Sequence, residues 1–131
     1  MSKSFNTFLI DPHNETITEV MYNGDYKEVY GHIDCDCFDV VTVNKQGDGL
    51  YVDDEGLFKS GQAFFKHADY PTPLAGKAFV LGCDKHGETV APAMTLQDLQ
   101  DKIAFVIPVR VNGEEILWLD HNGKFVHISK E

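Results

Sequence analysis

The first part of the chain alternates between apolar and polar residues, a period of two that is typical of β-strands. Glu15–Tyr22 shows this pattern, and Phe5–Ile10 before it also has the composition of a strand. The residues between them, Asp-Pro-His-Asn at 11–14, have the composition of a turn. The two segments therefore predict a β-hairpin.

Two other segments change to the helical period. In residues 26–33, apolar side chains recur at i, i+3, i+4 and i+7, which places them on one face of a short helix. Asp25 is the expected N-cap, and Glu28 stands in the capping-box position. Residues 96–103 show a similar apolar face after the capping-box sequence Thr-Leu-Gln-Asp at 95–98. We therefore predict two short helices.

Apolar and β-branched runs predict further strands. Cys37–Val43 is apolar on nearly every position, which is the pattern of a central strand. Leu50–Val52 and Gly76–Cys83 are also strand-like, whereas residues 62–72 show no clear period before a proline-rich loop. Between 104 and 128, two Asn-Gly dipeptides separate three apolar segments, which predicts a C-terminal β-meander.

These elements predict an α+β fold, mainly antiparallel sheet with two short helices packed on it. The 131 residues suit a single compact domain over 1–131, and a 43% hydrophobic composition is enough to form a core. No apolar run reaches the ~20 residues of a membrane span, and residues 1–10 lack a secretory pattern. With three cysteines in no recognisable disulfide framework, we expect a cytoplasmic protein.

The net charge of −10 is concentrated in one part of the chain. Residues 11–56 contain twelve Asp and Glu but only two Lys, and the remaining residues balance to zero. This distribution argues against nucleic-acid binding and against docking on an anionic membrane, because both need clustered Lys and Arg. We predict instead an acidic face that binds a protein with a basic surface. The acids assigned to this face are Asp34, Asp36, Asp39, Asp48, Asp53, Asp54 and Glu55.

Motifs for catalysis or metal binding are weak. The run His32–Cys37 contains imidazole, thiolate and carboxylate groups, but its Cys-x-Cys spacing is tighter than a zinc site prefers, so packing is the favoured interpretation. Asp53–Glu55 lacks the alternating spacing of a calcium loop. Nucleophile and phosphate-binding motifs are also missing. We therefore predict no cofactor, no metal and no enzymatic activity, with a metal-dependent hydrolase as a less favoured alternative.

Aromatic residues suggest two further kinds of contact. Tyr26, Tyr30 and Phe65 are candidates to stack a nucleotide-like ligand, although a single arginine disfavours a phosphorylated one. Trp118 lies in the C-terminal strands and is a possible interface residue. These strands either pack on their own core or leave an edge free for strand addition or for a homo-oligomer.

The order of elements resembles a known but uncharacterised domain family. The resemblance rests on Phe8–Asp11, Gly31–Ile33, Phe38–Val43, Tyr51–Leu57 and Leu74–Gly82. Proteins of this family are small and encoded by bacteriophages and mobile elements. The match covers about residues 5–103 and leaves 104–131 as additional C-terminal hairpins.

This family has no assigned activity or catalytic residues, so the resemblance implies only a setting. It implies an accessory protein acting in the cytoplasm of an infected bacterium, in host takeover or counter-defence. Combined with the acidic segment, this predicts a non-catalytic binding protein that acts on a host protein. A protein that sequesters a small nucleotide-like molecule is the alternative.

Overall fold

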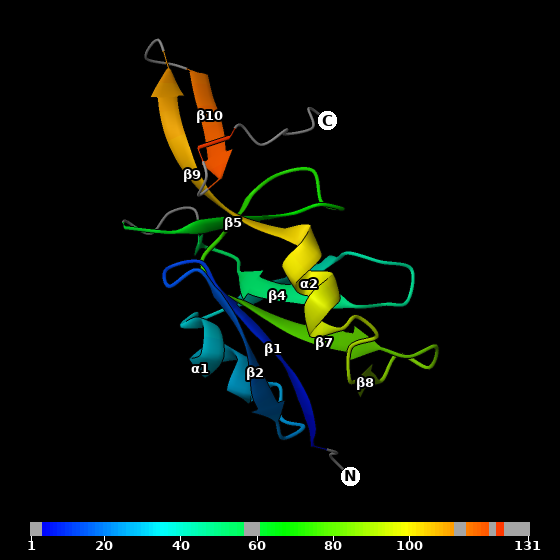
Figure 1. The fold of residues 1–131 in the computed structure, drawn as a ribbon. Helices are drawn as coiled ribbons and strands as arrows, with labels where there is room; N and C mark the ends of the chain where they lie inside the picture. The colour runs from blue at the N-terminus through cyan, green and yellow to red at the C-terminus, as the bar shows by residue number, and fades with distance from the viewer. Residues whose placement is uncertain (1–3, 57–60, 112–114, 121–122, 125–131) are drawn as a thin grey trace.

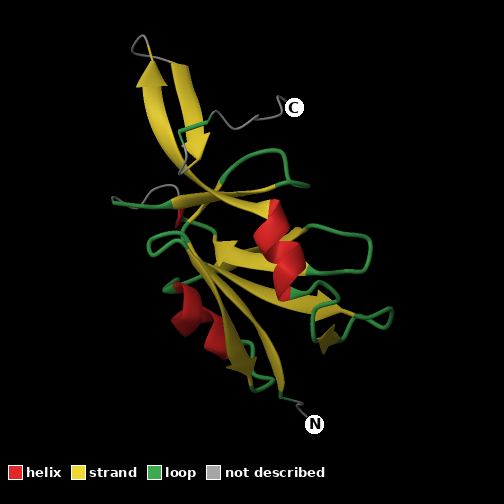
Figure 2. Cartoon of the chain, viewed as in Figure 1, coloured by secondary structure: helices red, strands yellow, loops and turns green. Residues whose placement is uncertain are grey.

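The computed structural model describes residues 4–56, 61–111, 115–120 and 123–124 (Figures 1 and 2). It confirms the predicted α+β class, a single domain built mainly of antiparallel strands with two short helices. The elements are β1 (Phe5–Asp11), β2 (Thr16–Tyr22), α1 (Lys27–Ile33), β3 (Phe38–Thr42), β4 (Gly49–Asp53), β5 (Phe64–His67), β6 (Leu74–Ala75), β7 (Ala78–Cys83), β8 (Thr89–Val90), α2 (Leu96–Lys102), β9 (Ile103–Val111) and β10 (Glu115–Asp120).

The strands form two antiparallel sheets. The larger sheet has the order β2-β1-β7-β4-β3, with β8 paired to the end of β7. The smaller sheet has the order β10-β9-β5-β6, and its β9–β10 hairpin projects away from the rest of the molecule in Figure 1. Strand β9 follows α2 directly, so this helix connects the body of the protein to the projecting hairpin.

Both faces of the larger sheet are covered. On one face, Val29 and Ile33 of α1 pack with Phe79 and Leu81 of β7. The opposite face carries a larger core that includes residues of β1, β4 and β7 together with Phe65 of β5 and Leu99 of α2. Burial of apolar side chains on both faces, at about 25 cal/mol per Å² of apolar surface, stabilises this arrangement.

Local sequence signals explain the hairpin and one helix start. In the turn between β1 and β2, Asp11 accepts hydrogen bonds from the backbone N–H groups of His13 and Asn14, at 3.0 and 3.3 Å. At the start of α2, Thr95 and Asp98 form the predicted capping box, with bonds of 3.1 and 2.9 Å. Both predictions are confirmed.

The start of α1 differs from the prediction. The N-cap is Tyr26, which makes no side-chain cap bond. Asp25 accepts from the N–H of Lys27 at 3.0 Å, and the Glu28 carboxylate accepts from the N–H of Asn23. The two acids still satisfy backbone donors around the helix start, but with partners shifted from those of a capping box.

Strand β3 is an edge strand, so the prediction of a central strand was wrong. Its apolar residues pack on both faces of the sheet, with Phe38 against the α1 side and Val41 against the other core. Val40, in contrast, has 49% of its surface exposed. The larger sheet is covered on one face by α1 and on the other by the smaller sheet and α2. Apolar residues on both faces of β3 therefore reflect this coverage, and do not require a central position in the sheet.

The C-terminal prediction is confirmed in part. Strands β9 and β10 form an antiparallel hairpin that pairs Val111 with Glu115 and Val106 with Asp120. The third predicted segment of the β-meander, 125–128, lies outside the described residues. Neither α1 nor α2 is long and apolar enough to cross a membrane.

Candidate functional site

The open end of the β3–β4 hairpin gathers four exposed acids. Phe38 pairs with Asp53, and the N–H of Asp54 donates to the carbonyl of Cys37 at 3.2 Å. This register places the residues just before β3 beside those just after β4. The exposed acids are Asp36, Asp39, Asp54 and Glu55, and we refer to them as the acidic edge.

Asp34 lies close to the acidic edge in sequence but has a different environment. It ends α1 in a left-handed conformation, with φ of 57°. Its carboxylate forms an ion pair with the ammonium of Lys77 at 3.2 Å, and 73% of its side chain is exposed. A nearby cation therefore offsets part of its charge, so we do not count Asp34 in the acidic edge.

Asp53 is only 9% exposed, and its Oδ1 accepts the backbone N–H of Glu55 at 3.0 Å. It holds the turn after β4 and does not belong to an exposed acidic face. Together with Asp34 it lines a polar pocket of about 330 Å³ that also includes His13, Gln62 and Lys77.

Asp48, at the opposite end of the β3–β4 hairpin, is 1% exposed. Its carboxylate accepts the backbone N–H groups of Ala93 and Met94, at 2.8 and 2.9 Å, and the side-chain amide of Asn44 at 2.9 Å. Its placement on a binding face was therefore wrong. A Gly- and Asp-rich turn predicts a loop, but the sequence does not show that a distant segment supplies donors to this carboxylate.

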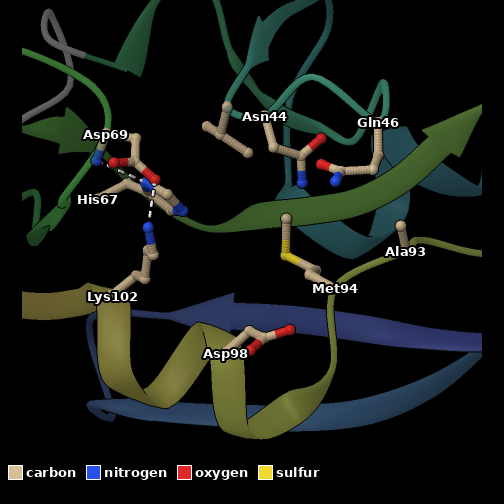
Figure 3. A pocket seen from close by; sticks show the side chains of 9 residues that line it. Asn44, Gln46, His67, Asp69, Ala93, Met94, Asp98 and Lys102 are labelled. Carbon is tan, nitrogen blue, oxygen red and sulfur yellow. Dashed lines mark hydrogen bonds and ion pairs between the residues drawn. The ribbon is translucent and has the colours of Figure 1, made fainter.

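A pocket of about 190 Å³ lies beside Asp48 (Figure 3). Three parts of the chain form it: the loop after β3, the end of β5 with the residues that follow, and the segment that leads into α2 and along it. We call it the His67 pocket. Its lining residues are Val43, Asn44, Gln46, His67, Asp69, Ala93, Met94, Asp98 and Lys102.

His67 is the most buried polar residue in the lining of this pocket, with 3% of its surface exposed. Its Nδ1 accepts the backbone N–H of Asp69 at 3.0 Å, so the neutral ring carries its proton on Nε2. Burial lowers the pKa of His67 below its ordinary value, while the charge of Asp69 opposes this shift. The imidazole is therefore neutral at pH 7 and offers an N–H donor.

An ion pair lies at the same end of the pocket. The ammonium of Lys102, from the end of α2, contacts Oδ2 of Asp69 at 2.6 Å. The hydrogen bond from Lys102 lowers the pKa of the Asp69 carboxyl. Behind it, buried Lys66 donates to the carbonyl groups of His67 and Tyr70, and burial lowers the pKa of Lys66. These contacts fix the turn that positions His67.

The other side of the His67 pocket carries amide and apolar groups. Asn44 is held by Asp48 through two hydrogen bonds, at 2.9 and 3.0 Å. Figure 3 shows Gln46 beyond Asn44, and Met94 between these amides and α2. Nothing in the sequence distinguishes His67 from the other five histidines, which are scattered along the chain. The aromatic pair Phe64-Phe65 was the signal that could have identified strand β5, because aromatic residues are enriched in strands.

The other candidate residues do not converge on one site. Cys35 is buried and Cys37 is exposed, while the His32 ring stacks on Phe79 with centroids 4.7 Å apart. Among the residues that the structure describes, no three His, Cys, Asp or Glu side chains are placed to hold a metal ion. Phe65 is fully buried in the core and is therefore unavailable to stack a ligand beside Tyr30, contrary to expectation.

Trp118 packs edge-on against Phe64, with ring centroids 5.1 Å apart, and joins β10 to β5. The hairpin thus packs partly on its own sheet. It also exposes apolar residues: Ile107 is 56% exposed and Ile116 is 48% exposed. Self-association through this hairpin stays a prediction.

The chain belongs to a family defined by a domain of unknown function, DUF3846, whose sequence model matches residues 5–104. The match includes both ends of the β3–β4 hairpin and every residue that lines the His67 pocket. Comparison with curated proteins and with solved structures finds no match.

Proposed function

We propose that this protein is a non-catalytic binding protein whose acidic edge docks on a basic surface of a partner protein. The observation that carries this proposal is the position of four exposed acids at the open end of one hairpin, brought together by the β3–β4 register. Lys77 pairs with Asp34, outside this group. Clustered charges of one sign attract a partner of opposite charge and accelerate its association.

The strand beside the acidic edge supports this proposal. Among the described strands, β3 pairs only with β4, so no described strand covers its other side. Exposed Val40 offers an apolar contact in the middle of β3. A partner segment that adds to this edge would gain main-chain hydrogen bonds there, and its basic residues would meet the acids at the end of the strand.

The partner that we propose is a host protein of an infected bacterium, in the host cytoplasm. This setting rests on the resemblance to phage and mobile-element proteins described above. A basic partner surface is common among proteins that handle nucleic acids. The proposed role is thus to occupy such a surface directly, with no nucleic acid or membrane contact by this chain.

The test compares two variants with the same change in charge. The acidic-edge variant carries Asp36→Asn, Asp39→Asn, Asp54→Asn and Glu55→Gln. The control variant carries Glu15→Gln, Glu19→Gln, Glu88→Gln and Asp101→Asn, which replace exposed acids elsewhere. Each protein is immobilised, incubated with bacterial lysate at about 50 and about 300 mM salt, and the retained proteins are quantified by mass spectrometry.

We expect wild type and control to retain the same basic proteins at low salt. The acidic-edge variant is expected to retain about tenfold less of these proteins. Higher salt is expected to reduce retention by wild type. Equal losses in both variants would show that only net charge matters, and unchanged retention by the acidic-edge variant would place the partner elsewhere. Either result would overturn the proposal.

A further inference from the structure

We propose that the His67 pocket binds an uncharged, planar heterocycle of the size of a nucleobase. This function is separate from the acidic edge, because Asp48 at the pocket and Asp54 at the edge lie at opposite ends of the β3–β4 hairpin. The proposal rests on three properties of the pocket: a free donor at its floor, the balance of its charges, and its size and amide groups.

The free donor is Nε2 of His67. Nδ1 is occupied by the N–H of Asp69, and Figure 3 shows the other ring nitrogen directed away from Asp69 toward the interior of the pocket. Within the described part of the chain, Nε2 makes no hydrogen bond, and no fully buried polar side-chain atom is left without a partner. Nε2–H is therefore reached through the pocket, where a ligand acceptor can satisfy it. A polar group so nearly buried gains most from such an acceptor.

The charges of the lining disfavour an anionic ligand. Lys102 already pairs with Asp69, and Asp98 adds a further carboxylate whose Oδ2 accepts the N–H of Thr95. With His67 neutral, the lining residues carry one positive and two negative groups. A phosphate or carboxylate would meet this net negative charge without an arginine to bind it. A neutral ring with acceptor and donor atoms avoids this repulsion.

The volume of the pocket and the chemistry of its lining narrow the class of ligand further. A volume of about 190 Å³ is smaller than the ~300 Å³ at which pockets for drug-sized ligands begin. Among the described residues, the side-chain amide of Gln46 makes no hydrogen bond, and Figure 3 shows it directed toward Asn44 at the pocket. Side-chain amides recognise the paired donor and acceptor edge of a base. The Met94 thioether and Val43 supply an apolar surface for its ring.

The test follows the His67 ring directly. Protein labelled with ¹⁵N and ¹³C is titrated with adenine, cytosine and uracil, and with acetate as an anionic probe, while ring signals of all six histidines are recorded by NMR. We expect at least one base to shift the Nε2 signal of His67 saturably, with an affinity that changes less than about twofold between low and high salt. Signals of the exposed His86 serve as an internal control.

A variant that keeps the fold separates this site from adventitious binding. Gln46→Ala removes an exposed loop amide, and Gln100→Ala makes the same change at an exposed position on α2 outside the pocket lining. We expect Gln46→Ala to weaken base binding about tenfold and Gln100→Ala to leave it unchanged. Met94→Ala is the second pocket variant and is expected to weaken binding through the lost ring contact.

Three outcomes would overturn the proposal. One is that none of the bases shifts the His67 ring. Another is that acetate shifts it while the bases do not, which would make the pocket an anion site. The third is equal weakening by Gln46→Ala and Gln100→Ala, which would place the bound base outside the pocket.

Discussion

The two ends of the β3–β4 hairpin both carry acidic residues, but these residues have opposite environments. At the loop end, Asp48 is 1% exposed and accepts three hydrogen bonds from distant and local donors. At the open end, Asp36, Asp39, Asp54 and Glu55 are all exposed. One acidic segment thus supplies a carboxylate that organises the fold and a set of carboxylates that remain available for a partner.

This difference shows why local charge alone does not define a binding surface. A buried carboxylate that accepts several N–H groups is stabilised by those contacts and leaves little charge at the surface. An exposed carboxylate contributes little to stability and keeps its charge in solution. The predictions below separate these two roles, beginning with the largest expected effect.

Removing the buried carboxylate tests its structural role. Asp48→Ala leaves the N–H groups of Ala93 and Met94 and the amide of Asn44 without their acceptor, and is expected to lower the free energy of unfolding by about 3–5 kcal/mol. Asp54→Ala at the open end is the matched control and is expected to change it by less than about 0.5 kcal/mol. Urea denaturation measures both, and similar values for the two variants would remove the distinction.

Crowding the same carboxylate gives a second, smaller effect. A Cβ at Gly82 would lie 2.7 Å from the carbonyl oxygen of Ala91 and 3.1 Å from Oδ1 of Asp48. Gly82→Ala is therefore expected to destabilise the protein by about 1–3 kcal/mol. A Cβ at Gly31 in α1 meets nothing within 4 Å, so Gly31→Ala is expected to stabilise it by up to about 1 kcal/mol. Thermal unfolding should thus move in opposite directions for the two variants.

Acid should weaken the loop end of the hairpin through the neighbouring His67. Because burial lowers its pKa, the unfolded chain binds a proton more readily than the folded protein, and stability falls as the pH drops through the ordinary histidine value of about 6.5. Asp69, whose pKa is lowered by its bond with Lys102, adds to this loss only in stronger acid. Denaturant midpoints between about pH 7.5 and 5 measure the effect.

The identity of the responsible histidine is checked by substitution. His67→Gln is expected to flatten this pH dependence, whereas replacement of exposed His86 by Gln should leave it unchanged. A profile that stays the same in His67→Gln would assign the titration to another group.

The smallest effect is expected for the ion pair at the pocket. Both side chains of the Asp69–Lys102 pair are 46% exposed, so Lys102→Met should cost less than about 1 kcal/mol. Asp34 forms a comparable exposed pair, and Lys77→Met is its counterpart near the open end. Urea denaturation should show similar small decreases in the free energy of unfolding for the two variants. A decrease above about 2 kcal/mol for Lys102→Met would instead give this pair a structural role like that of Asp48.

Elements with a clear local signal could be predicted from the sequence. The β1–β2 hairpin follows from its alternation and Asx turn, and α2 follows from its capping box. The edge position of β3 could not be predicted, since the strand's apolar faces depend on α1 and the smaller sheet, which approach from elsewhere in the chain. Strand β5 was missed because its pairing with β9 is non-local.

The candidate sites, like the fold, could be predicted only in part. The exposed acids were found because charge density is a property of the sequence, but the burial of Asp48 depends on donors more than forty residues away. The His67 pocket was missed for the same reason, because its walls come from three separate segments. Only the folded chain brings Gln46, His67 and Lys102 to one place.

The most direct test of the central claim is the association rate constant of a captured partner with wild type, the acidic-edge variant and its charge-matched control. If the open-end acids steer the partner, the rate constant at low salt should fall about tenfold in the acidic-edge variant and stay within about twofold of wild type in the control. Equal rate constants for wild type and the acidic-edge variant would contradict the claim that these carboxylates are the ones available for binding.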